Sequence, residues 1–465
     1  MSELPNGWTL EKFDDVGTYT DYVANGSFAS LRENVLQKDD EDYAILLRLK
    51  DHTNKFKGPF KYVTKSSYEF LAKSKLEPGD LFLANVGAPG RTFLVPELGK
   101  PMTIAPNGIR VRANEKSTNQ YLNYFIKSPA GQELITSITG GNAQQKFNKT
   151  ALRKSVLPIP PLEVQKQLVD KLDSVLAKVE AAQARLDKIP AILKRFRQSV
   201  LAAATSGELT KEWRENKTIK GVPLVRNKKL AQINPEDCYT LPISNWCWAR
   251  LGSVAELING DRGKNYPNRT EYVEQGVPFI NTGHIKTDGT LSHSKMNFIT
   301  LEKYESLRGG KTRPNDLVYC LRGATMGKIA RVNYEKGAIA SSLVIIRVDD
   351  NINRDFIYYF LNSPVGKSFI KKYDNGSAQP NLSAKSLASY AVYLPPQSEQ
   401  DEIVSKIDSL FACAESIERQ FNSAQANLNK LTQSILAKAF KGELLLTSVD
   451  SDIQAIENSI EALNA

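Results

Sequence analysis

The sequence has few of the residues that build metal sites, disulfides and membrane spans. Its 465 residues include only four cysteines and three histidines. Cys238, Cys247, Cys320 and Cys413 lie far apart and form no C-x-x-C pair, which argues against a structural zinc site. No stretch approaches the roughly 18 apolar residues of a membrane span, and the N-terminus lacks the basic and apolar regions of a signal peptide. We therefore expect a cytoplasmic protein with no metal and no cofactor.

The motifs of several enzyme classes are missing as well. A P-loop requires G-x-x-x-x-G-K-[ST], and the triplet that begins at Gly366 has Leu361 where the first glycine should stand. No Asp/Asn-Pro-Pro-Phe/Tyr run of an amino-methyltransferase is present. Asp80 and Asp316 follow turns as nuclease carboxylates do, but neither is followed by Glu-x-Lys at a suitable spacing, so we expect both to cap their turns. A nucleophilic Cys/His pair stays open, although core or surface histidines are the commoner case.

The charge balance points to a polyanionic partner. Lys and Arg number 61 against 51 Asp and Glu, which gives a net charge of +10. Hydrophobic residues make up 41% and charged residues 24%, as in ordinary globular proteins. A basic excess on such a chain favours nucleic acid, but many basic proteins bind none.

The dominant feature of the sequence is an internal duplication at an offset of 235 residues. Without gaps, residues 160–209 and 395–444 are identical at 19 of 50 positions, where background composition would give about three. The match continues upstream through Tyr124-Phe125 and Tyr359-Phe360, then thins. Residues 20–75 and 255–310 show little likeness. The chain is therefore two copies of one unit, each with a divergent front part and a well-matched rear part.

Each rear part carries the pattern of a long helix with a coiled-coil seam. Apolar or small residues recur at alternating steps of four and three, which is typical of helices that pair along their length. Pro190 would kink the first helix, and Lys438 ends the seam of the second. Gly207 and Gly442 stand where a helix C-cap is expected. Two helices on separate cores remain the alternative to pairing. The seam residues that we expect to form the coiled coil include Leu168, Leu172, Leu186, Leu193, Phe196, Ile403, Ile407, Phe421, Leu428 and Leu431.

The front parts have the pattern of mixed α+β globules of about 150 residues each. Strands are predicted from Asp80 and from Asp316, after turns, and at 109–112 and 343–347. Residues 119–137 and 354–372 are predicted to be helical. Residues 211–240, of mixed charge, are typical of a linker, and the tail after Leu446 has one acidic amphipathic stretch.

This arrangement resembles the specificity subunit of type I restriction–modification systems. The specific marks are the run Leu157 to Gln165, the run Ile192 to Leu201 and the run Ser206 to Trp213, with shorter versions at Leu394 to Gln400 and Ser434 to Leu444. The resemblance covers nearly the whole chain. It implies a non-catalytic DNA-binding subunit of an adenine-methyltransferase and endonuclease complex.

The resemblance also implies a domain plan. Two homologous target recognition domains would be separated by an antiparallel coiled coil of two long helices, related by a pseudo-twofold axis. Each domain would bind one half of a split, asymmetric DNA target, while the coil sets the gap and docks methyltransferase subunits, plausibly two, through which restriction subunits join. The expected bounds are 1–156 and 241–391 for the recognition domains, 157–210 and 392–446 for the helices, 211–240 for the linker and 447–465 for the tail.

Candidate DNA contacts come from matched loops, turn cations and the unmatched stretches. Gln144 and Gln379 lie in matched amide-rich loops and either contact DNA or fix the loop backbone. Arg91 and Lys328 follow Gly90 and Gly327 and could reach phosphates, or be solvated turn cations. Further candidates are Lys146, Arg32, Arg48, Lys55, Lys57, Lys61, Arg262, Lys264, Arg269 and Lys286. Arg195 and Arg197 are the candidates for docking a partner subunit.

Two other function classes stay open on the residues alone. An enzyme is disfavoured by the missing motifs. A coiled-coil scaffold with two protein-binding ends is compatible with the composition, and binding of random duplex DNA at low salt would separate it from a DNA-binding subunit.

Overall fold

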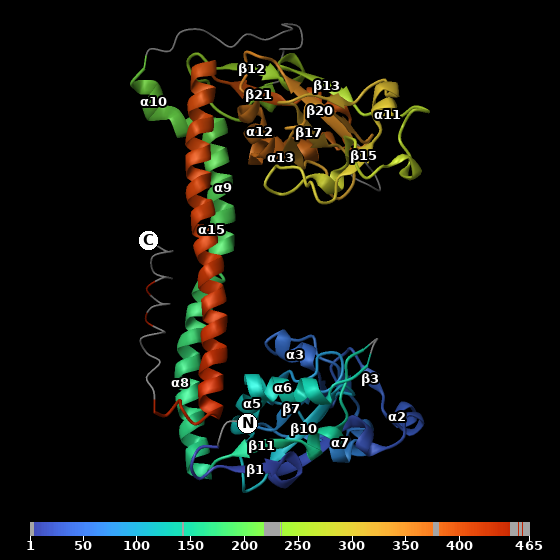
Figure 1. Cartoon of the computed structure of the whole chain (residues 1–465), viewed down its shortest axis with the longest axis vertical. Helices are drawn as coiled ribbons and strands as arrows, with labels where there is room; N and C mark the ends of the chain where they lie inside the picture. The colour runs from blue at the N-terminus through green and yellow to red at the C-terminus, as the bar shows by residue number, and fades with distance from the viewer. Residues whose placement is uncertain are drawn as a thin grey trace. The chain divides into compact units, whose positions relative to one another are not determined.

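The computed structural model describes residues 4–141, 144–217, 233, 235–374, 381–446, 454 and 458. The chain divides into two compact units. Unit 1 comprises residues 1–188 and 420–465, and unit 2 comprises residues 189–419. Each unit thus contains one front part together with a helical segment from each of the two repeats (Figure 1). Among the described helices, none is long and apolar enough to cross a membrane.

The front part of unit 1 is built on two sheets that share a buried core. The predicted strands at 81–84 and 109–112 are confirmed as neighbours in the first sheet, paired in antiparallel register with Ile109 opposite Leu83. The first sheet has the order β2 (Gly17–Asp21), β10 (Gly108–Ala113), β7 (Leu81–Ala84), β8 (Thr92–Leu94). The second has the order β3 (Gln37–Lys38), β5 (Tyr62–Val63), β4 (Ala44–Leu47), β9 (Met102–Ile104), β6 (Lys75–Leu76).

The front part of unit 2 repeats this topology. Its first sheet has the order β13 (Ala255–Asn259), β20 (Leu343–Val348), β17 (Leu317–Cys320), β18 (Ile329–Arg331). Its second has the order β15 (Asn297–Ile299), β14 (Val277–Ile280), β19 (Gly337–Ile339), β16 (Lys311–Thr312). In both second sheets one parallel pair, β4–β9 or β14–β19, stands among antiparallel ones. The divergent stretches therefore fold on a common frame.

The remaining short elements complete each front part. A two-stranded sheet brings the chain to the rear helices: β1 (Thr9–Lys12) with β11 (Val156–Ile159), and β12 (Cys247–Arg250) with β21 (Ala391–Leu394). The other helices are α1 (Phe13–Val16), α2 (Phe28–Asn34), α3 (Leu49–Thr53), α4 (Lys65–Phe70), α7 (Lys149–Lys154), α10 (Lys211–Glu215), α11 (Leu301–Ser306) and α14 (Ala384–Ala388).

The prediction that residues 119–137 and 354–372 are helical is confirmed, and each stretch forms two helices in succession. The chain forms α5 (Asn119–Lys127) and α6 (Pro129–Ile138), and α12 (Arg354–Asn362) and α13 (Pro364–Tyr373). Proline has no N–H to continue the first helix but suits the first turn of the second. Ser128 and Ser363 cap the new helices by accepting a hydrogen bond from the backbone N–H of Gly131 and Gly366.

The rear helices pair in antiparallel fashion within each unit. The first repeat forms α8 (Leu162–Leu186) and α9 (Ile189–Ser206), with a break before Pro190 where a kink was expected, and the second forms one helix, α15 (Gln397–Phe440). In unit 1 the side chains of Gln183 and Gln425 hydrogen-bond each other in both directions at 2.7 and 2.6 Å. In unit 2 Arg197 pairs with Glu418 at 2.8 Å.

Most of the predicted seam is buried. Leu168, Leu172 and Leu186 are at most 1% exposed, and Ile403 and Ile407 are fully buried. Phe196 is 37% exposed, and its counterpart Leu431, like Phe421, is only partly buried. Leu193 and Leu428 are buried. Beyond Ile435 the buried positions are Leu436, Ala439 and Phe440. The buried face of α15 therefore continues past the point where Lys438 interrupts the four-three pattern.

Matched side chains fasten each front part to the helix that follows it. Gln165 and Gln400, five residues after Pro160 and Pro395, are fully buried at the starts of α8 and α15. Each donates a hydrogen bond to that proline carbonyl at 2.9 Å and accepts one from the front part. The shared Pro-Pro-x-x-x-Gln motif is therefore a joint between sheet and coil.

A second pair of matched contacts lies farther along the same helices. The Tyr124 hydroxyl donates to Asp173, and the Tyr359 hydroxyl donates to Asp408. Burial, and then the hydrogen bond to the carboxylate, raise the pKa of both tyrosines, so both remain protonated donors. These contacts fix the angle between α5 or α12 and the coil within each unit.

The predicted C-cap glycines are confirmed at the ends of α9 and α15. Gly207 and Gly442 have φ of 79° and 76°, in the left-handed region that glycine adopts at little cost. A Cβ at Gly207 would lie 2.4 Å from Ile243, and one at Gly442 would lie 2.5 Å from Pro5, so both would collide. The start of each front part thus packs on the helix end of the other repeat, inside one unit.

Glu399 is a buried charge of unit 2 that accepts three side-chain hydrogen bonds. Its fully buried carboxylate accepts hydrogen bonds from Thr210 at 2.8 Å, from Trp246 at 2.8 Å and from Arg214. These donors lie in the segment after α9 and at the start of the second front part, so one carboxylate joins three stretches of chain. Residues on both sides of the predicted linker are thus joined within unit 2.

We predict that Glu399→Ala lowers the free energy of unfolding of unit 2 by about 3 kcal/mol, because the charge of Arg214 loses its carboxylate partner and the buried Trp246 and Thr210 lose their acceptor. The control is Glu415→Ala, which removes an exposed carboxylate from the same helix and should cost less than about 0.5 kcal/mol. Urea unfolding followed by tryptophan fluorescence measures both. Equal losses in the two variants would contradict the role given to Glu399.

Candidate nucleic-acid interface

Arg91 and Lys328 occupy equivalent places in the two front parts. Arg91 directly precedes β8 and Lys328 directly precedes β18, the last strand of the first sheet in each front part. Each follows a glycine, with φ of 83° and 87° respectively. A Cβ on Gly90 would lie 3.0 Å from Ile135 of α6, and one on Gly327 would lie 2.5 Å from Ile370 of α13. The turn therefore packs closely on the helix, which places both cations at the same edge of the frame.

In unit 2 this edge carries a basic hollow. Lys286, Lys328, Lys367 and Lys371 line a cavity of about 430 Å³, with Tyr358 and Ile370 among its walls and no Asp or Glu among its lining residues. Burial, and then the nearby charge of Lys194, lower the pKa of Lys367. Four cations around one hollow without a carboxylate is an arrangement that an anion would stabilise.

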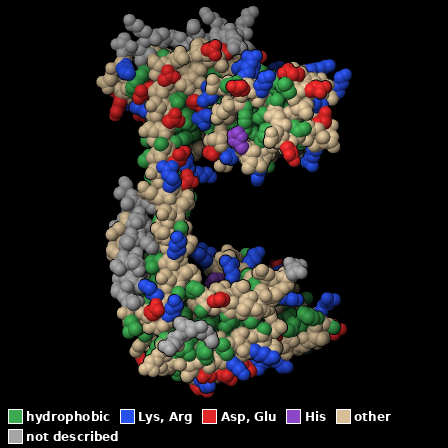
Figure 2. Space-filling model, viewed as in Figure 1, with side chains coloured by type: hydrophobic (Ala, Val, Ile, Leu, Met, Phe, Trp, Pro, Cys, Tyr) green, Lys and Arg blue, Asp and Glu red, His purple; other side chains and the backbone are tan. Residues whose placement is uncertain are grey.

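Unit 1 builds a basic surface at the corresponding edge from different residues. His52 of α3 stacks on Phe93 of β8, with ring centroids 4.6 Å apart and planes within 6°. The pKa of His52 lies below its usual value, first because of burial and then because Lys127 and Arg91 are close. Figure 2 shows Lys and Arg side chains gathered over α3. Both front parts therefore present cations beside the same turn.

The amide-rich loop that contains Gln144 lies against this turn in unit 1. Gly140 and Lys146 exchange two backbone hydrogen bonds of 2.9 Å, and Gly87 N–H donates to the carbonyl of Gln145 at 3.1 Å. Gln144 and Lys146 are exposed at the tip. Gln379, the predicted counterpart of Gln144, lies outside the described residues.

Asp80 and Asp316 have structural roles, as expected. Asp80 accepts the N–H of Glu77, and Asp316 accepts the N–H of Arg313, each at 2.8 Å. Each also binds an arginine through both carboxylate oxygens, Arg112 for Asp80 and Arg347 for Asp316, at 2.7 to 3.0 Å. Within the described residues, no group of three or more His, Cys, Asp or Glu is arranged to hold a metal ion.

The other predicted DNA contacts are not all free to bind. Arg48 holds Asp51 through two hydrogen bonds and also donates to the carbonyl of Pro59 at 3.1 Å, so it fastens its own loop. Lys57 is exposed in that loop. Arg262 and Lys264 are exposed after β13, beside a separate hollow of about 350 Å³ that Arg262 lines, and do not line the lysine hollow.

Sequence reasoning missed three cations at these surfaces: Lys127, Lys367 and Lys371. They lie on helices α5 and α13, which are predicted from their apolar faces, and Lys367 stands in the Gly-Lys-Ser triplet of an incomplete P-loop pattern. Their helical positions are matched by Asn362, Gln132 and Thr136 in the other copy, so comparing the copies hides them.

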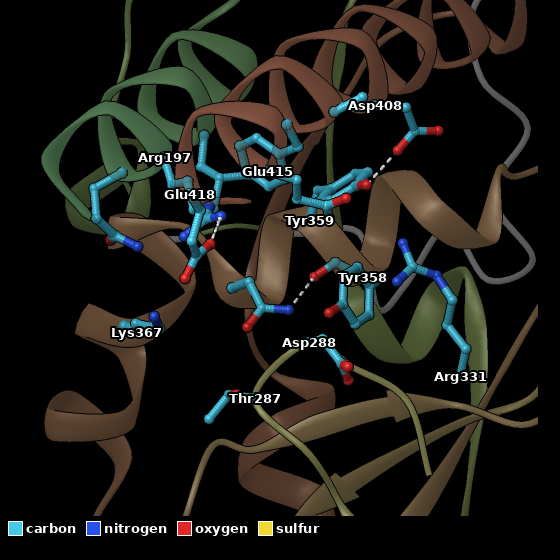
Figure 3. Close-up of a pocket in the computed structure, with 15 residues that line it drawn as sticks. Arg197, Thr287, Asp288, Arg331, Tyr358, Tyr359, Lys367, Asp408, Glu415 and Glu418 are labelled. Carbon is cyan, nitrogen blue, oxygen red and sulfur yellow. Dashed lines mark hydrogen bonds and ion pairs between the residues drawn. The ribbon is translucent and has the colours of Figure 1, made fainter. Parts of the chain in front are cut away.

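A matched cleft lies between the front part and the coil in each unit. In unit 2 it has a volume of about 620 Å³ and is lined by Tyr359 and Arg331 from the front part and by Glu415 and Glu418 of α15. Figure 3 shows Arg197 pointing toward Glu418, and Thr287 and Asp288 on the side opposite the coil. The counterpart in unit 1, of about 320 Å³, is lined by Tyr124, Glu180 and Gln183, at equivalent positions.

The two predicted docking arginines differ in their surroundings. Arg197 is engaged with Glu418 across the coil. Arg195 is exposed on α9, next to Phe196 and one turn from Ile192, which is 46% exposed. Two exposed apolar side chains four residues apart on a helix form an apolar stripe that suits another helix.

Comparison with known proteins identifies the family. The family described as "Type I restriction modification DNA specificity domain" matches residues 8–191 and 243–425, once in each repeat. The EcoBI specificity subunit of Escherichia coli is 33% identical over 392 residues, which cover 83% of this chain and 78% of that protein. The EcoKI specificity subunit of Escherichia coli strain K12 is 29% identical over 483 residues, covering 99% and 95%.

Solved structures share the fold. A chain from a study of "complex assembly and conformational transition of the type I R-M system" superposes with a TM-score of 0.63 at 20% identity, over 96% of this chain and all of that one. The HsdS subunit from Thermoanaerobacter tengcongensis gives a TM-score of 0.52 at 19% identity, over 95% and 98%. Together with the family match in both repeats and the 33% identity to the EcoBI subunit, this shows that the chain belongs to the family of type I restriction–modification specificity subunits.

Proposed function

We propose that each front part binds one half of a split DNA target and that the two halves differ. The recognition domains are assigned to residues 1–156 and 241–391. The observation that carries this is the basic surface at one equivalent edge of both front parts, next to stretches that have diverged. Phosphate contacts need the same cationic edge in both copies, whereas different bases need different loops.

Arg91 and Lys328 are proposed as phosphate contacts, supported by their equivalent positions after a tightly packed glycine. Lys127, Lys367 and Lys371 join them. Gln144 and Lys146 would contact DNA from the neighbouring loop, and Gln379 is proposed by its sequence match alone. Lys57 remains a candidate for base contact; Arg262 and Lys264 remain candidates in a separate part of the second domain.

The rear helices, residues 157–210 and 392–446, are proposed to set the gap between the half-sites and to dock methyltransferase subunits, one per repeat. Support comes from the antiparallel pairing in each unit and from the stripe of Ile192, Arg195 and Phe196 on α9. Restriction subunits would join through this complex. Residues 211–240 connect the repeats, and 447–465 form an acidic tail. The chain itself would supply binding and no chemistry, in the cytoplasm.

We predict that Arg91→Ala and Lys328→Ala each weaken binding to all duplexes about equally. The slope of log affinity against log salt should become shallower by about one unit per variant, because one phosphate contact is lost. Filter binding at several salt concentrations measures this. Lys336→Ala, which removes an exposed lysine outside this edge, is the control. A change of preferred sequence with an unchanged salt slope would refute the phosphate role.

We predict that Arg195→Glu reduces co-purification of the methyltransferase subunit at least about tenfold, because a reversed charge would stand beside the apolar stripe. The control is Arg185→Glu, a charge reversal on the exposed face of α8 near its end.

Adenine methylation should appear only when the methyltransferase is added. Methylation by the purified chain alone, given S-adenosylmethionine, would overturn the non-catalytic role.

A further inference from the structure

The divergent stretches contain many exposed residues, and the structure singles out one loop in each. In unit 1 it joins β4 to β5, and in unit 2 it joins β14 to β15. These loops are topologically equivalent, since β4 and β14 each pair in parallel with the matched strand β9 or β19. We name residues 52–57, which comprise the end of α3 and the turn after it, reading loop 1, and residues 286–288 reading loop 2.

Both reading loops dock on the same strand of the frame. Reading loop 1 packs through His52 and Phe56 onto Phe93 of β8, with ring centroids 4.6 and 5.6 Å apart. Reading loop 2 is anchored through the next residue, Gly289, whose carbonyl accepts a 3.0 Å hydrogen bond from the backbone N–H of Arg331 at the end of β18. Strands β8 and β18 begin next to Arg91 and Lys328. Each loop therefore lies beside the proposed phosphate contact of its domain.

Reading loop 1 is held in a costly conformation that exposes its cations. Lys55 and Phe56 are consecutive residues with φ of 52° and 56°, a region that non-glycine residues seldom adopt. Two hydrogen bonds keep them there: Phe56 N–H donates to the carbonyl of Asp51, and Lys55 N–H donates to that of His52, each at 2.8 Å. Phe56 turns inward, while Lys55 and Lys57 are exposed.

Reading loop 2 is a tight turn with a different set of groups. Lys286 accepts the N–H of Gly289 at 3.2 Å, and Asp288 accepts the N–H and hydroxyl of Thr290 at 2.8 and 2.6 Å. Gly289 is required because a Cβ there would lie 1.9 Å from the Tyr358 hydroxyl. Lys286, Thr287 and Asp288 are exposed, and the first two line the lysine hollow. Figure 3 shows Thr287 and Asp288 below Tyr358.

We propose that the two reading loops are the base-reading elements of the two domains. This inference rests on the proposed function and adds which residues determine each half-site. A rigid loop next to a phosphate contact lies at a fixed distance from the base edges of the same groove. Lys55 and Lys57 offer only donors, which suit guanine O6 and N7. Reading loop 2 adds an acceptor, Asp288, which suits the cytosine amino group.

The test uses the chain in complex with its methyltransferase subunits and selection from random duplex DNA. Lys55→Ala with Lys57→Ala should reduce preference at one or two positions of one half-site by about tenfold or more. Lys286→Ala with Asp288→Asn should do the same in the other half-site, because asparagine can still accept the hydrogen bonds from Thr290. The untouched half-site reports correct folding within each complex.

Lys65→Ala and Lys336→Ala are the matched controls, since both lysines are exposed in the same domains but outside the reading loops. Both controls should leave the selected DNA sequence unchanged. Arg91→Ala should weaken binding to DNA without changing the selected sequence. Unchanged half-sites in the loop variants, or a change in the wrong half, would overturn the inference while the proposed function stands. A wild-type complex that selected no sequence would overturn both.

Discussion

Each repeat buries its rear helix against the helix of the other repeat, and the rest of the structure depends on this pairing. Unit 1 combines α8 with the second half of α15, and unit 2 combines α9 with the first half. Neither copy could bury its seam alone, because an isolated amphipathic helix of this length leaves its apolar stripe in water. The reciprocal hydrogen bonds of Gln183 and Gln425 add a register constraint, since a shifted pairing would leave two partly buried amides unsatisfied.

The same pairing explains which parts of the repeats stayed alike. The matched residues are those that fasten a front part to the coil, such as Gln165 and Gln400 at the Pro-Pro motif. The residues that diverged include the loops after β4 and β14, which differ in length and in side-chain type. A rigid joint and a variable loop serve different needs. The joint keeps each cationic edge at a fixed place in its unit, and the loop is free to change what it contacts.

The duplication made most of the architecture predictable from the sequence, because an apolar seam repeated in both copies specifies paired helices. The strands and C-cap glycines followed from turn chemistry and are confirmed. The breaks at Pro129, Pro364 and Pro190 were only partly predicted, since proline both starts and interrupts helices. The site was less predictable: Arg48 is a strong candidate by charge but binds Asp51, and Lys367 lies on a helix whose counterpart carries glutamine. Side-chain partners across the fold decide such cases, and spacing along the chain does not encode them.

We expect the coil formed by the two repeats to fix the distance between the two half-sites. The most direct test inserts one seam-preserving heptad into each strand of the coil, after Val179 and after Leu428, within the continuous part of α8 and α15 and away from the break before Pro190. Seven helical residues add about 10 Å, and duplex DNA rises about 3.4 Å per base pair. Sequencing of methylated sites should show the same half-sites with a gap about three base pairs longer, at reduced efficiency because the duplex also turns by roughly 100° over that length. Undiminished methylation at the original gap would contradict the account.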